Sequence, residues 1–190
     1  NALTPGTHFG CDIIKRARQN IIVLRDQFSS YTTADFINDE TSDSLEEGII
    51  KLTTPIRHSG SIILRTDQAP GFIKAAKSPR LDNLQIKIEV GSSLNKNSNA
   101  VIDKGIQELE REITVIAPGK KPIDQVILSK AIMILNNRLR RNGTLSARTI
   151  LFSRDDKRMT NIVLDDSELA KDQLQSREKN NEYHNQKVKI

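Results

Sequence analysis

The stretch Ser61–Phe72, SIILRTDQAPGF, is the one from which the rest of the chain can be interpreted. Its apolar run Ile62–Leu64 predicts a buried strand that ends near Asp67. Pro70 and Gly71 predict a tight turn directly afterwards, because proline fixes its own φ and glycine tolerates a sharp bend. A carboxylate at the end of a buried strand is held by a rigid sheet and remains accessible. Asp67 is therefore a candidate for chemistry.

The composition limits the class of protein. A chain of 190 residues with 36% hydrophobic residues predicts one folded domain together with a segment that packs less well. No run of about 18 apolar residues is present, which argues against a membrane span. The single cysteine, Cys11, and only three histidines exclude a disulfide within the chain and a Cys/His zinc module. We interpret Cys11 as a small core residue.

The positive charge is unevenly distributed. The formal net charge is +5, and residues 154–190 carry eight basic and eight acidic side chains, so the whole excess lies before residue 154. A basic folded domain favours a polyanionic partner such as nucleic acid. We predict a folded domain over residues 1–153 and a charged C-terminal tail or linker, partly disordered, over residues 154–190.

The strands are expected early in the chain. Three stretches, separated by a turn at Gln19-Asn20 and by the charged pair Arg25-Asp26, predict an antiparallel meander. A helix capped by Thr41 or Ser42 and ended by Pro55 should cross back to a parallel strand. A last strand is predicted by alternating apolar and polar residues. The five predicted strands are 8–18, 21–24, 28–37, 62–67 and 85–90.

Helices dominate the second half. Residues 100–116 carry their apolar side chains along one side, which predicts an amphipathic helix. A second long helix should begin at Asp124 and end at Asn142-Gly143, followed by a short one over 144–152. A short helix is also expected around 81–84, and a polar loop over 91–99. This order predicts an α/β fold with a mixed five-stranded sheet, three antiparallel strands plus two parallel ones, flanked by helices.

Three carboxylates could meet in such a fold. Asp12 lies on the first strand, Asp67 ends the fourth, and Asp103 lies in the first turn of the helix over 100–116. Fifty-four residues separate the first pair and 35 separate the second. Three gathered carboxylates would repel one another and raise their own pKa values unless cations bound between them. Hard divalent cations such as Mg²⁺ prefer oxygen ligands of this kind.

The spacing and its surroundings carry a family resemblance. The segments are FGCDIIKRARQNIIVLRDQFSSYTTADFI around Asp12, LRTDQAPGF around Asp67 and NKNSNAVIDKGIQELERE around Asp103. Together they resemble the catalytic core of a retrotransposon (retroviral-type) integrase from a Pol polyprotein, a member of the ribonuclease-H-like superfamily. The resemblance covers about residues 7–153. The family usually carries Glu at the third position, and because Asp is one methylene shorter, the helix must lie closer to the sheet.

The resemblance implies an activity and its partners. The family trims a DNA 3′ end and joins it to a target strand with Mg²⁺ or Mn²⁺, two ions being expected. Asp12 and Asp67 would share the ions and Asp103 would hold the second, with Lys15, Arg16 and Arg18 adding positive charge nearby. The expected partners are retroelement DNA ends, target DNA and further copies of the chain in a homo-oligomer, with no membrane. The expected location is the nucleus, with a stage in a cytoplasmic particle. The residues expected to contact DNA are Lys96, Lys104, Gln107 and Arg111.

Other interpretations remain open at this point. The chain could be a nucleic-acid-binding or assembly module whose chemistry has decayed, or a ribonuclease H nuclease on the same fold. Taken singly, Asp67 could be a turn-forming residue, and Asp103 could be a first-turn acid that stabilises the helix dipole. An unpaired Asp12 in an apolar strand is harder to explain without a function, because burying a carboxylate is costly.

Overall fold

The computed structural model describes residues 4–58, 60–91, 100–139 and 145–152, together with Lys171 and Gln175. The chain divides into two compact units, Asn1–Leu151 and Phe152–Ile190, and the five strands lie in the first unit. The loop expected over 91–99 lies outside the described residues from residue 92 onwards, and so does the expected tail, apart from Lys171 and Gln175.

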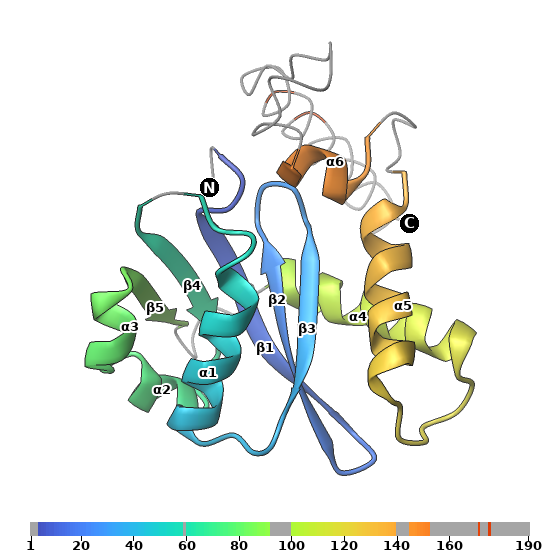
Figure 1. Cartoon of the computed structure of the whole chain (residues 1–190), viewed down its shortest axis with the longest axis horizontal. Coiled ribbons are helices and arrows are strands. Elements are labelled where there is room, and N and C mark those ends of the chain that lie inside the picture. The colour runs from blue at the N-terminus through green and yellow to red at the C-terminus, as the bar shows by residue number, and fades with distance from the viewer. Residues whose placement is uncertain are drawn as a thin grey trace, which may run out of the picture. The chain divides into compact units, whose positions relative to one another are not determined.

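One mixed sheet forms the centre of the first unit (Figure 1). The strand order is β3-β2-β1-β4-β5. β2 pairs antiparallel with both β1 and β3, whereas β4 pairs parallel with both β1 and β5. The predicted class, three antiparallel strands plus two parallel ones, is confirmed. The strands are β1 (His8–Arg16), β2 (Gln19–Asp26), β3 (Thr32–Ile37), β4 (Ile62–Thr66) and β5 (Ile86–Val90).

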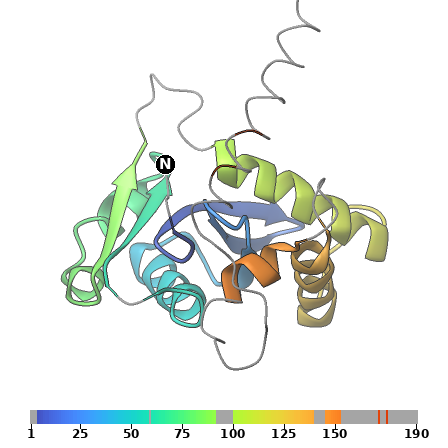
Figure 2. The ribbon, with the colours of Figure 1, turned by 90° about the horizontal axis from the view of Figure 1, so that it is seen from above.

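Helices cover both faces of this sheet. α1 lies on one face and α4 on the other (Figure 2), while α5 packs against α4 and β3. The predicted bounds of α4 are confirmed, as is the cap of α1, where the Thr41 side chain accepts a hydrogen bond from the backbone N–H of Ser44. No described helix combines the length and the apolar character needed to cross a bilayer. The helices are α1 (Ser42–Thr53), α2 (Pro70–Ala75), α3 (Pro79–Asn83), α4 (Ala100–Ile116), α5 (Gln125–Asn137) and α6 (Ala147–Phe152).

The alternation of side chains along β1 assigns residues to the two faces. Phe9 and Cys11 are fully buried in the core that also holds the apolar residues of α1. Ile14 belongs to the second core, which contains the apolar residues of α4 and α5. Because side chains alternate along a strand, Gly10 and Asp12 share the face of Ile14 and therefore lie on the α4 side. The interpretation of Cys11 as a core residue is confirmed.

The hairpin between β1 and β2 differs from the prediction. The turn is Ala17-Arg18, with φ values of 47° and 67°, and Gln19 already belongs to β2. Neither residue favours a left-handed backbone, so no local pattern predicts a turn at these two positions. The register is held from outside: the Arg16 Nε–H donates to the carbonyl of Lys121 over 2.9 Å, and the Gln19 amide donates to that of Ile123 over 2.8 Å.

The prediction that Arg25-Asp26 interrupts the second strand is wrong, because the pair forms the last two residues of β2. Both side chains are buried, at 2% and 0% exposure. Asp26 accepts hydrogen bonds from the backbone N–H groups of Gly6 and Ser29, over 2.8 and 2.6 Å. Charged residues can occupy a buried strand when each is hydrogen-bonded or paired in this way.

Two predictions about where helices begin and end are also wrong. Pro70 and Gly71 open α2 instead of forming a turn, because proline at the first helical position already has a helical φ. α5 ends at Asn137 and not at residues 142–143, because Arg138 adopts an extended backbone and its neighbour Leu139 forms a β-bridge with Ser146.

Candidate functional site

The sheet register brings Asp12 and Asp67 together. β1 and β4 run parallel, and their last aligned pair is Gly10 with Arg65. Asp12 and Asp67 each lie two residues beyond that pair, so continuing the register places them side by side. β1 continues beyond this point along β2, while the chain leaves the sheet after Thr66. Asp67 therefore lies at the open carboxyl end of β4, as predicted.

The segment after Asp67 is held by a close approach of two backbones. A Cβ atom on Gly71 would lie 2.2 Å from the carbonyl oxygen of Glu40, so only glycine fits there. The Asp67 carboxylate is exposed and its Oδ1 accepts a hydrogen bond from the Ala69 N–H over 3.1 Å. The Glu40 side chain in turn pairs with Lys15 over 2.5 Å. These contacts attach the start of α2 to the region around β1.

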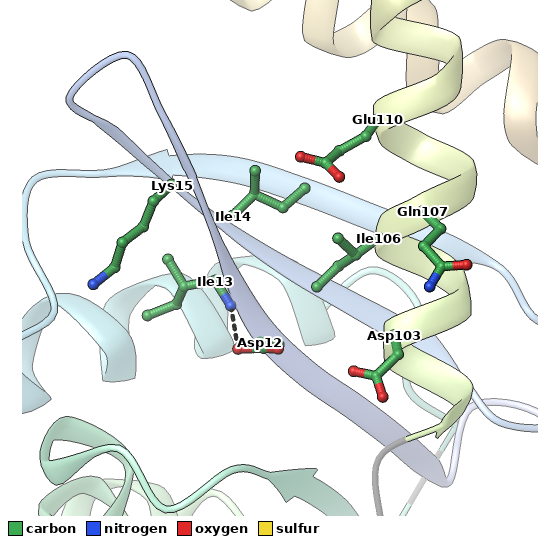
Figure 3. Close-up of a pocket in the computed structure, with 8 residues that line it drawn as sticks. All are labelled: Asp12, Ile13, Ile14, Lys15, Asp103, Ile106, Gln107 and Glu110. Atoms are coloured by element: carbon green, nitrogen blue, oxygen red, sulfur yellow. Dashed lines mark hydrogen bonds between the residues drawn. The ribbon is translucent and has the colours of Figure 1, made fainter. Parts of the chain in front are cut away.

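Asp103 approaches the same region from the helix. A cavity of about 420 Å³ is lined by Asp12, Lys15, Asp103, Gln107 and Glu110 together with three isoleucines. Figure 3 shows the Asp103 carboxylate projecting from the first turn of α4 towards β1, where Asp12 lies. Asp67 is not among the residues that line this cavity. Asp12 thus lies between the other two carboxylates, with Asp67 on the neighbouring strand and Asp103 across the cavity.

The electrostatics of Asp12 reflect this gathering of acids. Burial raises the pKa of Asp12 from its ordinary 3.8 to about 6. The hydrogen bond from the Ile13 N–H, 2.7 Å from Asp12 Oδ1, opposes that shift, whereas the negative charges of Asp67 and Asp103 add to it. Asp67 and Asp103 are therefore each close enough to Asp12 to act on it electrostatically.

The donor set suits a hard cation. Within the part of the chain that the structure describes, no group of three His, Cys, Asp or Glu side chains is arranged to hold a metal ion as it stands. The three aspartates nevertheless offer only carboxylate oxygens, the ligands that Mg²⁺ and Mn²⁺ prefer. A cation between them would also remove the mutual repulsion that contributes to the raised pKa of Asp12.

The pKa of Asp12 predicts how the metal-free protein responds to pH. Because the folded pKa is raised, the folded chain binds the proton more tightly than the unfolded chain does. The associated stability is fully present below about pH 4 and is lost as the pH rises through about 6. Asp12→Asn, which keeps an acceptor for the Ile13 N–H, should raise the free energy of unfolding by about 1–2 kcal/mol at pH 8, after allowance for solvent screening.

Denaturant unfolding of the parent and of Asp12→Asn in the presence of a chelator, from pH 4 to pH 8, measures this difference in the free energy of unfolding. The two stabilities should converge at the acid end and separate above pH 6. A constant difference over the whole range would show that the charge of Asp12 does not destabilise the fold.

The residues expected to contact DNA differ in their position relative to the cavity. Gln107 lines the cavity, one turn of α4 beyond Asp103. Lys104 and Arg111 are exposed on the same helix but do not line the cavity, and Lys96 lies outside the described residues. Of the basic residues on β1, Lys15 lines the cavity, whereas Arg16 binds backbone carbonyls of the segment between α4 and α5.

Two features of the site were missed from the sequence. Glu110 lines the cavity with Asp12 and Asp103, and a heptad spacing from Asp103 along α4 could have indicated it. The second feature is Gly10, where a Cβ atom would lie 2.8 Å from the Cβ of Ile102 on α4. No local pattern distinguishes such a glycine, because its partner is about ninety residues away in the sequence.

Comparisons with known proteins identify the fold. No family model matches the chain, and no curated protein matches it in sequence. Among solved structures, it is similar to the catalytic core domain of bovine immunodeficiency virus (BIV) integrase, with a TM-score of 0.62 and 20% identity over 82% of this chain and 99% of that one. It is also similar to the HTLV-2 integrase catalytic core domain, solved in complex with magnesium in a trimeric form, with a TM-score of 0.64 and 16% identity over 80% and 99%.

A third similar structure comes from a larger assembly. It is a chain of the simian T-cell lymphotropic virus intasome in complex with the PP2A regulatory subunit B56 gamma, with a TM-score of 0.67 and 18% identity. The match covers 87% of this chain but only 60% of the viral one. Strand order, helix placement and these three matches agree. The chain therefore has the ribonuclease-H-like fold of retroviral integrase catalytic cores.

Proposed function

We propose that this chain is the catalytic core of a metal-dependent DNA integrase, which trims the 3′ ends of retroelement DNA and joins them to target DNA. The observation that carries the proposal is the placement of Asp12, Asp67 and Asp103. They come from β1, the end of β4 and the first turn of α4, and the charges of Asp67 and Asp103 both act on Asp12. The fold shared with retroviral integrase cores makes DNA the favoured substrate.

The three aspartates would hold the cations. Asp12 is central and partly buried, so it would share both ions with Asp67 on one side and Asp103 on the other. Two divalent ions would supply Lewis acidity at the scissile phosphate and lower the pKa of the attacking hydroxyl. The exposed positions of Asp67 and Asp103 leave their outer sides open to the phosphate of a DNA strand. The magnesium in the HTLV-2 core supports this choice of ion.

Both reactions break one phosphoester bond of DNA, and strand transfer also forms a new one. In end trimming, water attacks a phosphodiester and the bond to the 3′ oxygen breaks, which leaves a free 3′ hydroxyl on the element. In strand transfer, that hydroxyl attacks a target phosphodiester and releases a target 3′ hydroxyl. Gln107 would contact the DNA held over the cavity, with Lys104 and Arg111 placed along the exposed side of α4.

The proposal extends to assembly and location. The similar structures include an intasome and a trimeric core, and we propose that this chain also acts as a homo-oligomer on DNA. Large apolar side chains on α5 are exposed, with Val126 at 59% and Met133 at 54%, and burial against a second copy would remove them from water. Action on host DNA would place the protein in the nucleus, after a stage in a cytoplasmic particle.

A branched DNA substrate tests the chemistry without knowledge of the terminal sequence. Because strand transfer replaces one phosphodiester by another, the same groups must catalyse its reversal. The chain should resolve a branched duplex with a 3′ hydroxyl beside the junction in the presence of Mn²⁺, and Asp103→Asn should abolish this reaction. A parent chain that binds DNA without metal and never joins strands would instead identify a binding module. Activity unchanged in Asp103→Asn would remove Asp103 from the site.

A further inference from the structure

The first turn of α4 lies unusually close to β1. A Cβ atom on Gly10 would lie 2.8 Å from the Cβ of Ile102 and 3.4 Å from its backbone N. Ile102 is fully buried and is anchored in the core between the sheet and α4, so it cannot rotate away as an exposed side chain could. Any residue larger than glycine at position 10 must therefore push the start of α4 away from the sheet.

A second glycine repeats this close approach one turn later. A Cβ atom on Gly105 would lie 2.6 Å from Cδ of Arg25, which is buried in β2. Ile102 and Gly105 are three residues apart and share the sheet-facing side of α4. The helix thus rests on β1 at one point and on β2 at the next. Its distance from the sheet is fixed over the turn that carries Asp103.

This distance decides how far the third carboxylate must reach. Asp103 directly follows Ile102, and Asp12 lies two residues after Gly10 on the same face of β1. Gly10, which lets α4 approach the sheet, therefore lies beside Asp12, the carboxylate that Asp103 must approach. An aspartate carries its carboxylate on a single methylene, one fewer than glutamate. A close helix suits the short side chain, and a displaced helix would suit the long one.

We propose that Gly10 is a positioning residue that adapts the site to aspartate at position 103. This inference rests on the proposed function, because it assumes that Asp103 holds a cation together with Asp12. It goes further by explaining why a short third ligand is workable in this chain. A glycine needed only for core packing would affect stability in the same way but would leave the preference between Asp and Glu unchanged.

The test is a double-mutant cycle on the full 190-residue chain. The four proteins are the parent, Gly10→Ala, Asp103→Glu, and the chain that carries both changes. The readout is the Mn²⁺ dissociation constant, measured by titration calorimetry without DNA. We expect each single change to weaken Mn²⁺ binding by about 10-fold or more, as disturbed ligand geometry does, and the double change to bring the constant back within about 3-fold of the parent.

Gly48→Ala serves as the matched control. A Cβ atom on Gly48 would lie 3.1 Å from Cγ2 of Ile22, so this change also crowds a helix against the sheet, but through α1 on the opposite face. It should lower stability without altering the Mn²⁺ constant or its response to Asp103→Glu.

The outcomes separate this inference from the proposed function. If the parent binds Mn²⁺ and the double change binds no better than either single one, the role of Gly10 is overturned and the metal site stands. If Gly10→Ala does not fold, Asp103→Glu alone decides, because binding equal to or tighter than the parent contradicts an adaptation to aspartate. A parent chain that binds no Mn²⁺ would overturn both the proposed function and this inference.

Discussion

Asp67→Asn should lower the rate of strand transfer by at least about 1,000-fold while leaving the fold and the affinity for DNA nearly unchanged. The loss follows from removing one charged cation ligand, because a bound metal contributes several kcal/mol of transition-state stabilisation. The fold should persist because Asp67 is exposed, and an Asn side-chain carbonyl can accept equally well the hydrogen bond that the Ala69 N–H donates to the Asp67 carboxylate. Joining of the branched duplex in Mn²⁺ and DNA binding in a chelator measure the two quantities.

A suitable control is Asp82→Asn. Asp82 is an exposed acid on α3 and has no part in the proposed site, so its removal changes the net charge equally. If Asp67→Asn joined DNA at the parent rate, the assignment of Asp67 would be wrong. If both variants lost activity to the same extent, the effect would come from net charge and not from cation binding.

Arg25→Ala should destabilise the fold by about 3 kcal/mol. The Arg25 side chain is 2% exposed, and its Nη1 lies 2.7 Å from Glu108 on α4 and 3.3 Å from the hydroxyl of Thr32. Its Nε is buried and has no hydrogen-bond partner within the described part of the chain, so the ion pair with Glu108 is its main compensation. Removing the side chain leaves Glu108 unpaired and opens space beneath Gly105.

Lys51→Ala gives the comparison for this prediction. Lys51 also forms an ion pair, with Asp35, but its side chain is 71% exposed. Its loss should cost less than about 1 kcal/mol, since solvent screens an exposed pair. Urea unfolding of both variants measures the difference. Equal costs would mean that the buried pair does not hold α4 against β2.

Much of the fold could be predicted because its signals are local. The alternating residues of β5, the amphipathic pattern of α4 and the cap of α1 each depend on neighbours in the sequence. The order of strands and helices then predicts the mixed sheet. The spacing of the three aspartates predicts that they approach one another; the sheet register places Asp67 beside Asp12, and Asp103 lines the same cavity as Asp12.

Features that depend on distant contacts could not be predicted. Ala17-Arg18 forms the hairpin turn although neither residue is a turn former, because Arg16 and Gln19 are held by the segment before α5. Arg25 stays in a strand because α4, 83 residues later in the sequence, supplies Glu108. The need for glycine at position 10 arises only when α4 is packed against β1.

Direct binding of Mn²⁺ tests the central claim most closely. Calorimetry would monitor the titration of four proteins with Mn²⁺ in the absence of DNA. They are the parent and the variants Asp12→Asn, Asp67→Asn and Asp103→Asn. A shared site predicts that the parent binds and that each substitution weakens binding by about 10-fold or more, with Asp12→Asn the most severe because Asp12 lies between the other two carboxylates. Binding that survives all three substitutions at the parent affinity would contradict the claim that these carboxylates form a cation site.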